Sequence, residues 1–367
     1  MIDRIIEFSA RNKYLVIIFT LVAIAGAYHW MRQVPLDAIP DLSDTQVIIY
    51  SRWDRSPDII EDQVTYPIVT AMLGAPKVKA IRGFSDFGFS YVYVIFEDGT
   101  DLYWARSRTV EYLSKILPRL PEGVRTELGP DATSVGWVYQ YALVDKTGQN
   151  DLSQLRSLQD WNLRYQIQSV PGVAEVASIG GFQKQYQVNI DPSKLLAFNI
   201  PISTVVQAIR DGNNDVGGRL VEFSGAEYMV RGRGYVKSVG DIEKIVVGTD
   251  KQGTPILVKN LGTVTLGPEI LRGIADLDGE GDTVGGIVIM RAGENALNVI
   301  EKVKEKLKEI KQSLPKGVEI VTTYDRSTLI ERAIDTLKEE LVLEVIIVSL
   351  VILVFLWHIP SALIPIL

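Results

Sequence analysis

Two long apolar runs, one near each end of the chain, restrict the fold more than any other feature of the sequence. Tyr14–Met31 contains no Asp, Glu, Lys or Arg, and at ~1.5 Å per residue a helix of this length crosses a hydrocarbon core of about 30 Å. Leu341–Trp357 is a second apolar run, which Glu344 alone interrupts. It ends in aromatic residues of the kind that collect at membrane interfaces. The sequence therefore predicts transmembrane helices at 14–31 and 337–357.

Basic residues beside the first run predict how the chain crosses the membrane. Arg4, Arg11 and Lys13 precede the run, and such residues concentrate on the cytoplasmic side. We therefore expect residues 1–13 in the cytoplasm and the roughly 300 residues between the runs on the opposite side. A cleaved signal peptide is the alternative, but its apolar part is only ~7–15 residues long. No small-residue cleavage site follows Met31, which favours a retained helix.

The composition excludes several classes of function. The chain has no cysteine, which excludes disulfides and thiolate metal ligands. Its formal net charge of -7 argues against nucleic acid as a partner. No phosphate-loop, zinc-protease or nucleophile-elbow motif occurs, so we expect neither an enzyme nor a bound cofactor. The two histidines, His29 and His358, flank the apolar runs, where an interfacial role is more common than metal binding.

Two short phrases each occur twice between the apolar runs. Pro76-Lys77-Val78 returns as Pro171-Gly172-Val173, and Leu120-Pro121-Glu122-Gly123-Val124 returns as Leu314-Pro315-Lys316-Gly317-Val318. Each phrase follows a stretch with helical spacing of apolar residues and precedes a β-branched stretch. Each unit thus reads strand, helix, strand, strand, helix, strand, which is the order of the ferredoxin-like βαββαβ fold. We predict a fold that combines membrane α-helices with two such α+β subdomains.

These units predict the domain boundaries. The first subdomain takes residues 38–130, and the second takes 131–181 and 276–333, with an insertion at 182–275. The glycine-rich stretch Gly212–Gly234 in the insertion fits either a mobile loop or a hairpin arm that reaches a neighbouring subunit, and the spacing favours neither. The expected helices are 57–73, 101–117, 154–169, 203–210 and 296–313. The expected strands are 46–50, 79–82, 90–96, 138–143, 174–179, 185–190, 245–249, 256–261, 284–290 and 318–323.

Candidate metal ligands are few. Met72, Met229 and Met290 carry the thioethers between the apolar runs. A soft ion such as Cu(I) prefers thioether ligands, whereas isolated Met residues usually fill cores. Met72 is our candidate for a thioether metal ligand. Asp276–Asp282 has the acidic alternation of a calcium loop, but it precedes a strand and lacks the Glu expected at the loop's twelfth position, so we expect a solvated turn.

Eight longer passages of the sequence are specific enough to compare with known protein families. They are Pro35–Asp44 (PLDAIPDLSD), Asp62–Pro67 (DQVTYP), Ile81–Ser85 (IRGFS), Ser90–Arg108 (SYVYVIFEDGTDLYWARSR), Glu127–Thr133 (ELGPDAT), Leu155–Trp161 (LRSLQDW), Val173–Gly181 (VAEVASIGG) and Glu319–Ser327 (EIVTTYDRS). Together they resemble the heavy-metal efflux branch of the resistance–nodulation–division transporters, most closely its copper/silver type. The resemblance runs over the whole chain.

The resemblance implies a proton-driven pump of the bacterial inner membrane. Such a pump works as a homotrimer, joined to a periplasmic adaptor protein and an outer-membrane channel, and it uses the proton motive force instead of a cofactor. The two subdomains resemble its N-terminal pore subdomains, and the insertion resembles half of its docking domain, whose arm contacts the next subunit. The proton relay and the methionine cluster are expected in a later part of the protein. Ile270 stands where copper-type members can carry Met.

The resemblance also adds a second site candidate and orders the possible functions. Arg82 is the candidate for an ion pair in the pore, with a carboxylate from a later part of the protein, although a structural salt bridge is the simpler role. Export of Cu(I) or Ag(I) is the leading function, and export of divalent Zn, Co or Ni ions is the alternative. A two-span receptor with an extracytoplasmic sensor domain is the third. Residues 362–367 are apolar again, which predicts the start of a third membrane helix at 361–367 and argues against a receptor.

Overall fold

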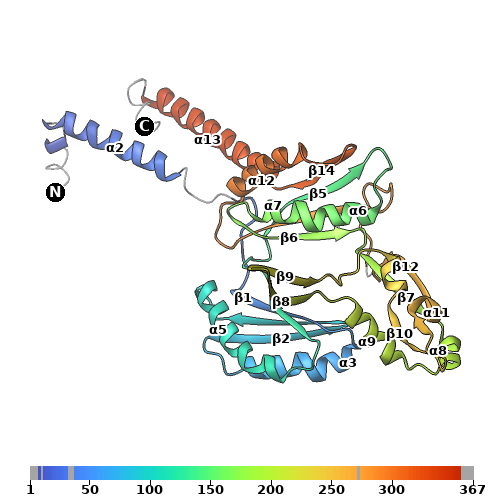
Figure 1. Cartoon of the computed structure of the whole chain (residues 1–367). Coiled ribbons are helices and arrows are strands. Elements are labelled where there is room, and N and C mark those ends of the chain that lie inside the picture. Colours follow the sequence, from blue (N-terminus) through green and yellow to red (C-terminus); the bar gives the residue numbers. More distant parts are fainter. Residues whose placement is uncertain (1–6, 10, 32–36, 271–272, 357–367) are drawn as a thin grey trace. The chain divides into compact units, whose positions relative to one another are not determined.

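Figure 1 shows the computed structural model, which describes residues 7–9, 11–31, 37–270 and 273–356. The chain divides into two compact units. The first comprises residues 1–148, 158–179 and 284–367, and the second comprises 149–157 and 180–283. The second unit therefore extends beyond the predicted insertion, 182–275, at both ends and takes in residues from the preceding helix.

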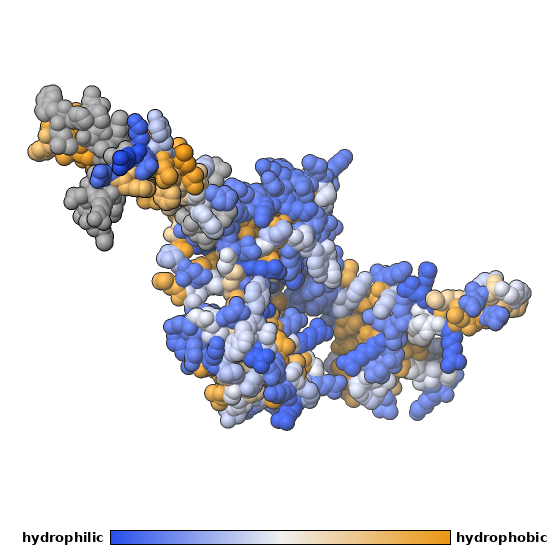
Figure 2. Space-filling view, turned by 90° about the vertical axis from the view of Figure 1, so that its left-hand side faces the viewer, coloured by the Kyte–Doolittle hydropathy of each residue, from blue (hydrophilic) through white to orange (hydrophobic). Residues whose placement is uncertain are grey.

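Two apolar helices belong to the first unit. Helix α2 (Lys13–Met31) holds the one segment among the described residues, Lys13–Trp30, that is long and apolar enough to cross a membrane. Helix α13 (Ser327–Leu356) is continuous over 30 residues. It contains most of the predicted second span, but its last 18 residues include Glu339, Glu340 and Glu344 and do not meet the same criterion. Trp357 and the predicted third helix at 361–367 lie outside the described residues. Figure 2 shows hydrophobic residues gathered on the surface of this helical part.

The first subdomain is a four-stranded antiparallel sheet with helices on one face. Its elements are β1 (Gln46–Arg52), α3 (Pro57–Ile60), a π-helical turn (Glu61–Thr65), α4 (Tyr66–Met72), β2 (Val78–Asp86), β3 (Phe89–Phe96), α5 (Leu102–Ile116) and β4 (Arg125–Leu128). The strand order is β2-β3-β1-β4. Alternate residues of β1 and β3, such as Val47 and Val92, are buried against Ile68 and Met72 of α4 because side chains alternate between the two faces of a strand.

The second subdomain has the same arrangement. Its elements are β5 (Trp137–Asp145), α6 (Leu152–Leu158), a π-helical turn (Gln159–Leu163), α7 (Arg164–Gln168), β6 (Val173–Gly180), β13 (Val284–Met290), α12 (Ala296–Lys311) and β14 (Val318–Asp325). The strand order β14-β5-β13-β6 corresponds strand for strand to that of the first subdomain. Helix α12 lies against β5 and β14 (Figure 1) and buries its apolar side, which includes Val299, Val303 and Leu307. Both sheets therefore follow the element order that the two sequence phrases predict.

A glycine pair in β13 makes room for a buried tyrosine. A Cβ added at Gly286 would lie 2.5 Å from both Cζ and Oη of Tyr141. The Tyr141 hydroxyl donates a hydrogen bond of 2.8 Å to Gln159 Oε1 inside the core. Burial raises the pKa of Tyr141, so the hydroxyl remains a donor. The contact fixes helix and sheet against each other at one position.

The repeated phrases are helix-to-strand turns with left-handed backbone. Gly123 and Gly317 both have φ of 90°, a conformation that glycine adopts without a steric penalty. In the other phrase Gly172 has φ of 94° and Lys77 has φ of 60°. The repeated phrases therefore share a left-handed backbone conformation at the turn.

The second unit contains the inserted elements. They are β7 (Lys184–Ile190), α8 (Pro192–Phe198), α9 (Ile202–Gly212), β8 (Val216–Phe223), β9 (Ala226–Gly232), α10 (Val239–Glu243), β10 (Val246–Thr249), β11 (Pro255–Leu257), α11 (Val258–Leu261) and β12 (Gly262–Pro268). The strand predicted at 256–261 is wrong beyond Leu257, because the Asn260 side chain accepts the Leu257 N–H and starts α11. Two elements were not predicted from the residue pattern: α8, which Asp191 caps through the Ser193 N–H, and β12, which pairs with β7.

The glycine-rich stretch forms a two-stranded hairpin, which we call the arm (residues 216–232). Ser224 and Gly225 turn the chain with φ of 55° and 74°, the signature of a tight two-residue hairpin turn. The acidic stretch 276–282 is a turn as expected, because the Asp276 carboxylate accepts the N–H groups of Gly279 and Gly281.

We expect Gly286→Ala to destabilise the protein by about 1–3 kcal/mol, because the new Cβ overlaps the buried Tyr141 ring. Thermal unfolding of the detergent-solubilised protein measures the effect. Gly240→Ala is the matched control, because its new Cβ would meet nothing closer than Ser238 Oγ at 3.8 Å. Equal melting temperatures for the two variants would contradict the packing described here.

Candidate functional site

The connections to both apolar helices meet at Arg326. This residue stands between β14 and α13, and its side chain is 2% exposed. Its Nη2 lies 2.9 Å from Oδ1 of Asp37, the first described residue after α2. Its Nη1 donates to the carbonyl oxygen of Val135, between the two subdomains. One guanidinium therefore joins its own segment to two others that are far apart in sequence.

Further hydrogen bonds join two of these segments, which we call the post-helix segment (residues 37–45) and the linker (residues 129–136). The Ser43 and Ser134 hydroxyls are hydrogen-bonded, and the Ser134 N–H donates to Ser43 Oγ at 3.3 Å. Asp41 accepts from Thr133. Burial alone would raise the pKa of Asp41, but hydrogen bonds from Thr133 and Ser43, together with the charge of Arg326, lower it below its usual value. Asp41 is therefore a stable acceptor here.

The start of α13 is held to α12 by a second ion pair. Lys304 Nζ lies 2.5 Å from Asp325 Oδ2 and donates to Ser327 Oγ at 2.8 Å. Burial by itself would raise the pKa of Asp325, yet hydrogen bonds from Lys304 and Ser327 outweigh it and lower the pKa. The Arg326 N–H also donates to Val138 O of β5 at 3.1 Å. The first turn of α13 is thereby anchored to the second subdomain.

Arg326 and Asp37 were not singled out from the sequence. Both lie in passages that carry the family resemblance, at 35–44 and 319–327, but a lone charged residue in a passage does not reveal its partner. A buried arginine with a carboxylate almost 290 residues away becomes visible only in the folded chain. Removing Asp37 leaves the Arg326 charge buried without compensation, a change that costs about 3–5 kcal/mol.

A cavity of about 640 Å³ lies between the two subdomains of the first unit. Its walls include Tyr50, Tyr91 and Tyr93 from the open face of the first sheet, and Arg164 and Glu175 from the second subdomain. The linker residues Gly129, Pro130 and Asp131 line it as well. The same linker whose far end contacts Arg326 therefore forms part of the cavity wall.

Polar contacts fix the linker where it passes the cavity. Arg106 of α5 donates to Gly129 O at 2.8 Å. Asp131 pairs with Arg291 at 3.2 Å and accepts from the Tyr103 hydroxyl at 2.9 Å. The hydrogen bond to Asp131 raises the pKa of Tyr103. The linker is therefore bonded to both subdomains.

Arg82 lies on the open face of the first sheet. It is exposed and directly opposite Tyr93 in the β2–β3 register. Among the described residues, no acidic side chain forms an ion pair with it. On the same face, Tyr50 stacks against Phe89 with ring centroids 5.9 Å apart. The predicted partner of Arg82 in a later part of the protein stays a prediction.

The three methionines lie in separate places. Met72 is fully buried in the core of the first subdomain, and Met290 is buried in β13. Met229 is 78% exposed on the arm. Among the described residues, no group of three or more His, Cys, Asp or Glu side chains is arranged to hold a metal ion. The role of Met72 as a ligand stays a prediction.

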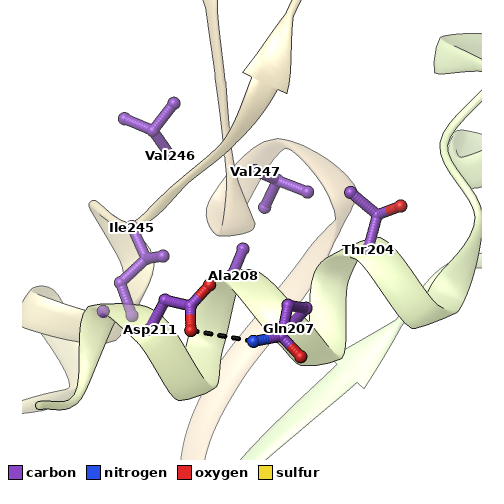
Figure 3. Close-up of a pocket in the computed structure, with 8 residues that line it drawn as sticks. Thr204, Gln207, Ala208, Asp211, Ile245, Val246 and Val247 are labelled. Atoms are coloured by element: carbon purple, nitrogen blue, oxygen red, sulfur yellow. Dashed lines mark hydrogen bonds between the residues drawn. The ribbon is translucent and has the colours of Figure 1, made fainter.

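The second unit has a cavity of its own, of about 460 Å³, between α9 and β10 (Figure 3). Thr204, Gln207 and Asp211 line it from the helix, and Ile245 and Val247 line it from the other side. Gln207 Nε2 donates to Asp211 Oδ1 at 2.8 Å (Figure 3). Gln207 and Asp211 thus bond to each other rather than to a group in the cavity.

Comparison with known proteins identifies relatives along the full chain. It is 52% identical over 367 residues to the putative cation efflux system protein SilA of Salmonella typhimurium, and 52% identical over the same length to the cation efflux system protein CusA of Escherichia coli (strain K12). Each match covers 100% of this chain and 35% of the relative. Identity to the cobalt-zinc-cadmium resistance protein CzcA of Cupriavidus metallidurans is 38% over 373 residues, covering 99% of this chain and 35% of that protein.

The fold has a solved counterpart. A crystal structure of a heavy metal efflux pump superimposes with a TM-score of 0.87 at 34% identity, over 96% of this chain and 35% of that one. The chain thus spans about a third of the length of the relatives it matches. Residues 5–367 match the model of the AcrB/AcrD/AcrF family. The chain belongs to this family of resistance–nodulation–division efflux transporters.

Proposed function

We propose that the full-length protein exports Cu(I) or Ag(I) as a proton-driven pump of the bacterial inner membrane. The observation that carries this is the 52% identity to SilA and CusA over the whole chain, against 38% to the cobalt-zinc-cadmium protein CzcA. The passages that resemble the copper/silver type support the same ions. The divalent alternative is less favoured because the relatives named for divalent ions are more distant.

In this proposal the present chain supplies moving parts rather than the ion-binding centre. Protonation in a later part of the protein displaces the membrane helices, among them α2 and the apolar half of α13. The two subdomains then open and close a periplasmic cleft, whose polar wall includes the tyrosines and carboxylates of the 640 Å³ cavity. A multi-pass topology follows, with the region between α2 and α13 in the periplasm.

The arm supports the proposed homotrimer. Leu220, Phe223 and Met229 are 57%, 69% and 78% exposed on it. A two-stranded hairpin with apolar residues in solvent is stable only when a partner covers it. We assign that cover to the next subunit. A periplasmic adaptor and an outer-membrane channel would complete the pump.

Deletion of the gene in its native host tests the substrate. We expect tolerance of silver and copper salts to fall, and tolerance of zinc, cobalt and nickel to stay unchanged. Growth at graded metal concentrations measures both, and plasmid-borne full-length protein should restore tolerance. Unchanged silver and copper tolerance would refute the substrate assignment.

Met72→Leu separates a metal ligand from a core residue. Leu keeps the volume but removes the sulfur, so we expect silver tolerance to remain at the wild-type level, since Met72 is fully buried among apolar residues. Met72→Ala is the companion variant and should cost about 2–5 kcal/mol of stability through the cavity it leaves. A loss of silver tolerance in Met72→Leu, with normal protein levels, would instead make Met72 a ligand.

The arm predicts the effect of a charge at the subunit contact. In Met229→Asp we expect the trimer fraction in detergent to fall roughly tenfold or more, because burying an uncompensated carboxylate costs several kcal/mol. Size-exclusion chromatography with light scattering measures it. Glu227→Gln, on the same strand, is the control and should remain trimeric. A fully trimeric Met229→Asp protein would place the arm outside the contact.

A further inference from the structure

We propose that Arg326 is a positioning residue for transport, which joins α13 and the post-helix segment to the linker so that the three move as one rigid joint. The inference rests on the proposed pump function. It goes beyond that function by naming the residue through which helix displacement reaches the cavity between the subdomains. The residues of this joint are Asp37, Asp41, Ser43, Thr133, Ser134, Val135 and Arg326.

The path from α13 to the joint contains no flexible spacer. Arg326 immediately precedes Ser327, the first residue of α13. The helix runs 30 residues without Gly or Pro, the residues at which helices most often kink. The Arg326 carbonyl accepts the N–H groups of Leu329 and Ile330 at 3.1 Å. A tilt or shift of α13 is therefore applied directly to the Arg326 backbone.

The post-helix segment, which follows α2 in the sequence, contacts the same guanidinium. Asp37 is paired with Arg326 at 2.9 Å, and the Ile39 carbonyl lies 3.5 Å from Nη2. Beyond it, Asp41 and Ser43 bond to Thr133 and Ser134 of the linker. The post-helix segment thus cannot move away from the linker without breaking three hydrogen bonds, and it cannot move away from Arg326 without breaking the Asp37 ion pair.

The linker carries the displacement onward to the cavity. Its end at Val135 is held by Arg326, and its beginning at Gly129 and Asp131 lines the cavity and is bonded to Arg106 and Arg291. A shift of the joint therefore pulls on a segment that touches both subdomains. The start of α13, the post-helix segment and one cavity wall therefore share a single connection at Arg326.

The chemistry requires arginine in particular. The two Nη atoms contact different segments, Asp37 on one and Val135 on the other. A lysine ammonium is a point charge on a flexible stem and does not reproduce this planar fork. The Nε atom is buried with no hydrogen-bond partner among the described residues, so the side chain is held through its two terminal nitrogens.

Kinetics of the full-length pump in proteoliposomes test the role. For Arg326→Gln we expect a maximal rate of silver transport reduced roughly tenfold or more, with KM unchanged within about twofold, because coupling is lost while ion binding is not. Asp37→Asn should behave alike, and the double variant should be no slower than either single one, because the two residues act as a pair. Arg119→Gln, an exposed arginine in another part of the first subdomain, is the control and should match wild type. A raised KM with an unchanged maximal rate would overturn the proposal.

A disulfide tests rigidity without altering Arg326. The chain has no cysteine, so Ser43→Cys/Ser134→Cys introduces a single pair at two hydroxyls that already touch. A joint that moves as one body predicts rapid oxidation with or without a proton gradient, and wild-type transport after oxidation. If oxidation abolishes transport and reduction restores it, the joint opens during the cycle and the proposal is wrong. This assay also decides the case if Arg326→Gln fails to accumulate.

The two hypotheses fail in different ways. A wild-type pump that moves neither silver nor copper refutes the proposed substrate, and the kinetic comparison is then made with the divalent ion that it does move. Oxidation of the cysteine pair is measured by gel shift in membranes and depends on no substrate. A rate of pair formation that changes strongly when the proton gradient is applied would overturn the rigid joint whatever ion is exported.

Discussion

The ion pair between Arg326 and Asp37 is the constraint on which the arrangement of the first unit depends. Its charges lie at opposite ends of the sequence, yet they meet where both apolar helices connect to the folded subdomains. A buried charge pair is not a large source of stability, because desolvation offsets most of the attraction. Its value is specificity: few other arrangements of these segments satisfy both charges and the Val135 carbonyl at once.

The two sheets of the first unit follow from the alternation of side chains along their strands. Alternating burial in β1 and β3 sets which face of the first sheet receives helices. The other face keeps aromatic and charged residues and becomes a cavity wall. The same rule builds the second sheet, where Gly286 makes room for the Tyr141 ring. The open face of the first sheet and the linker thus form the cavity wall together.

Much of this fold was predictable from the sequence. Both βαββαβ units and the helix predicted at 14–31 carry strong periodicity, and the family resemblance rests on long passages. For the glycine-rich stretch 212–234, by contrast, the spacing left a loop and a hairpin equally open. The strand at 256–261 failed because a side chain, Asn260, competes with strand pairing by capping a short helix. The Arg326 joint escaped prediction because its partners are separated by almost 290 residues, and no periodicity encodes such a contact. The two site candidates, Met72 and Arg82, remain separate: one is in the core and the other on the open face.

The turn at Lys77 shows that corresponding turns of the two subdomains can have a left-handed backbone with different residues. Gly172 reaches the same left-handed backbone through the freedom of having no side chain. Lys77 reaches it with a side chain, whose ammonium lies 4.9 Å from the centroid of the Trp104 ring, while its carbonyl accepts the Glu97 N–H. A glycine in one turn and a lysine that contacts a tryptophan ring in the other therefore both have left-handed backbone. A search for internal duplication that compares residue identities would not match Lys77 with Gly172. A search that compares backbone torsion angles would match the two turns.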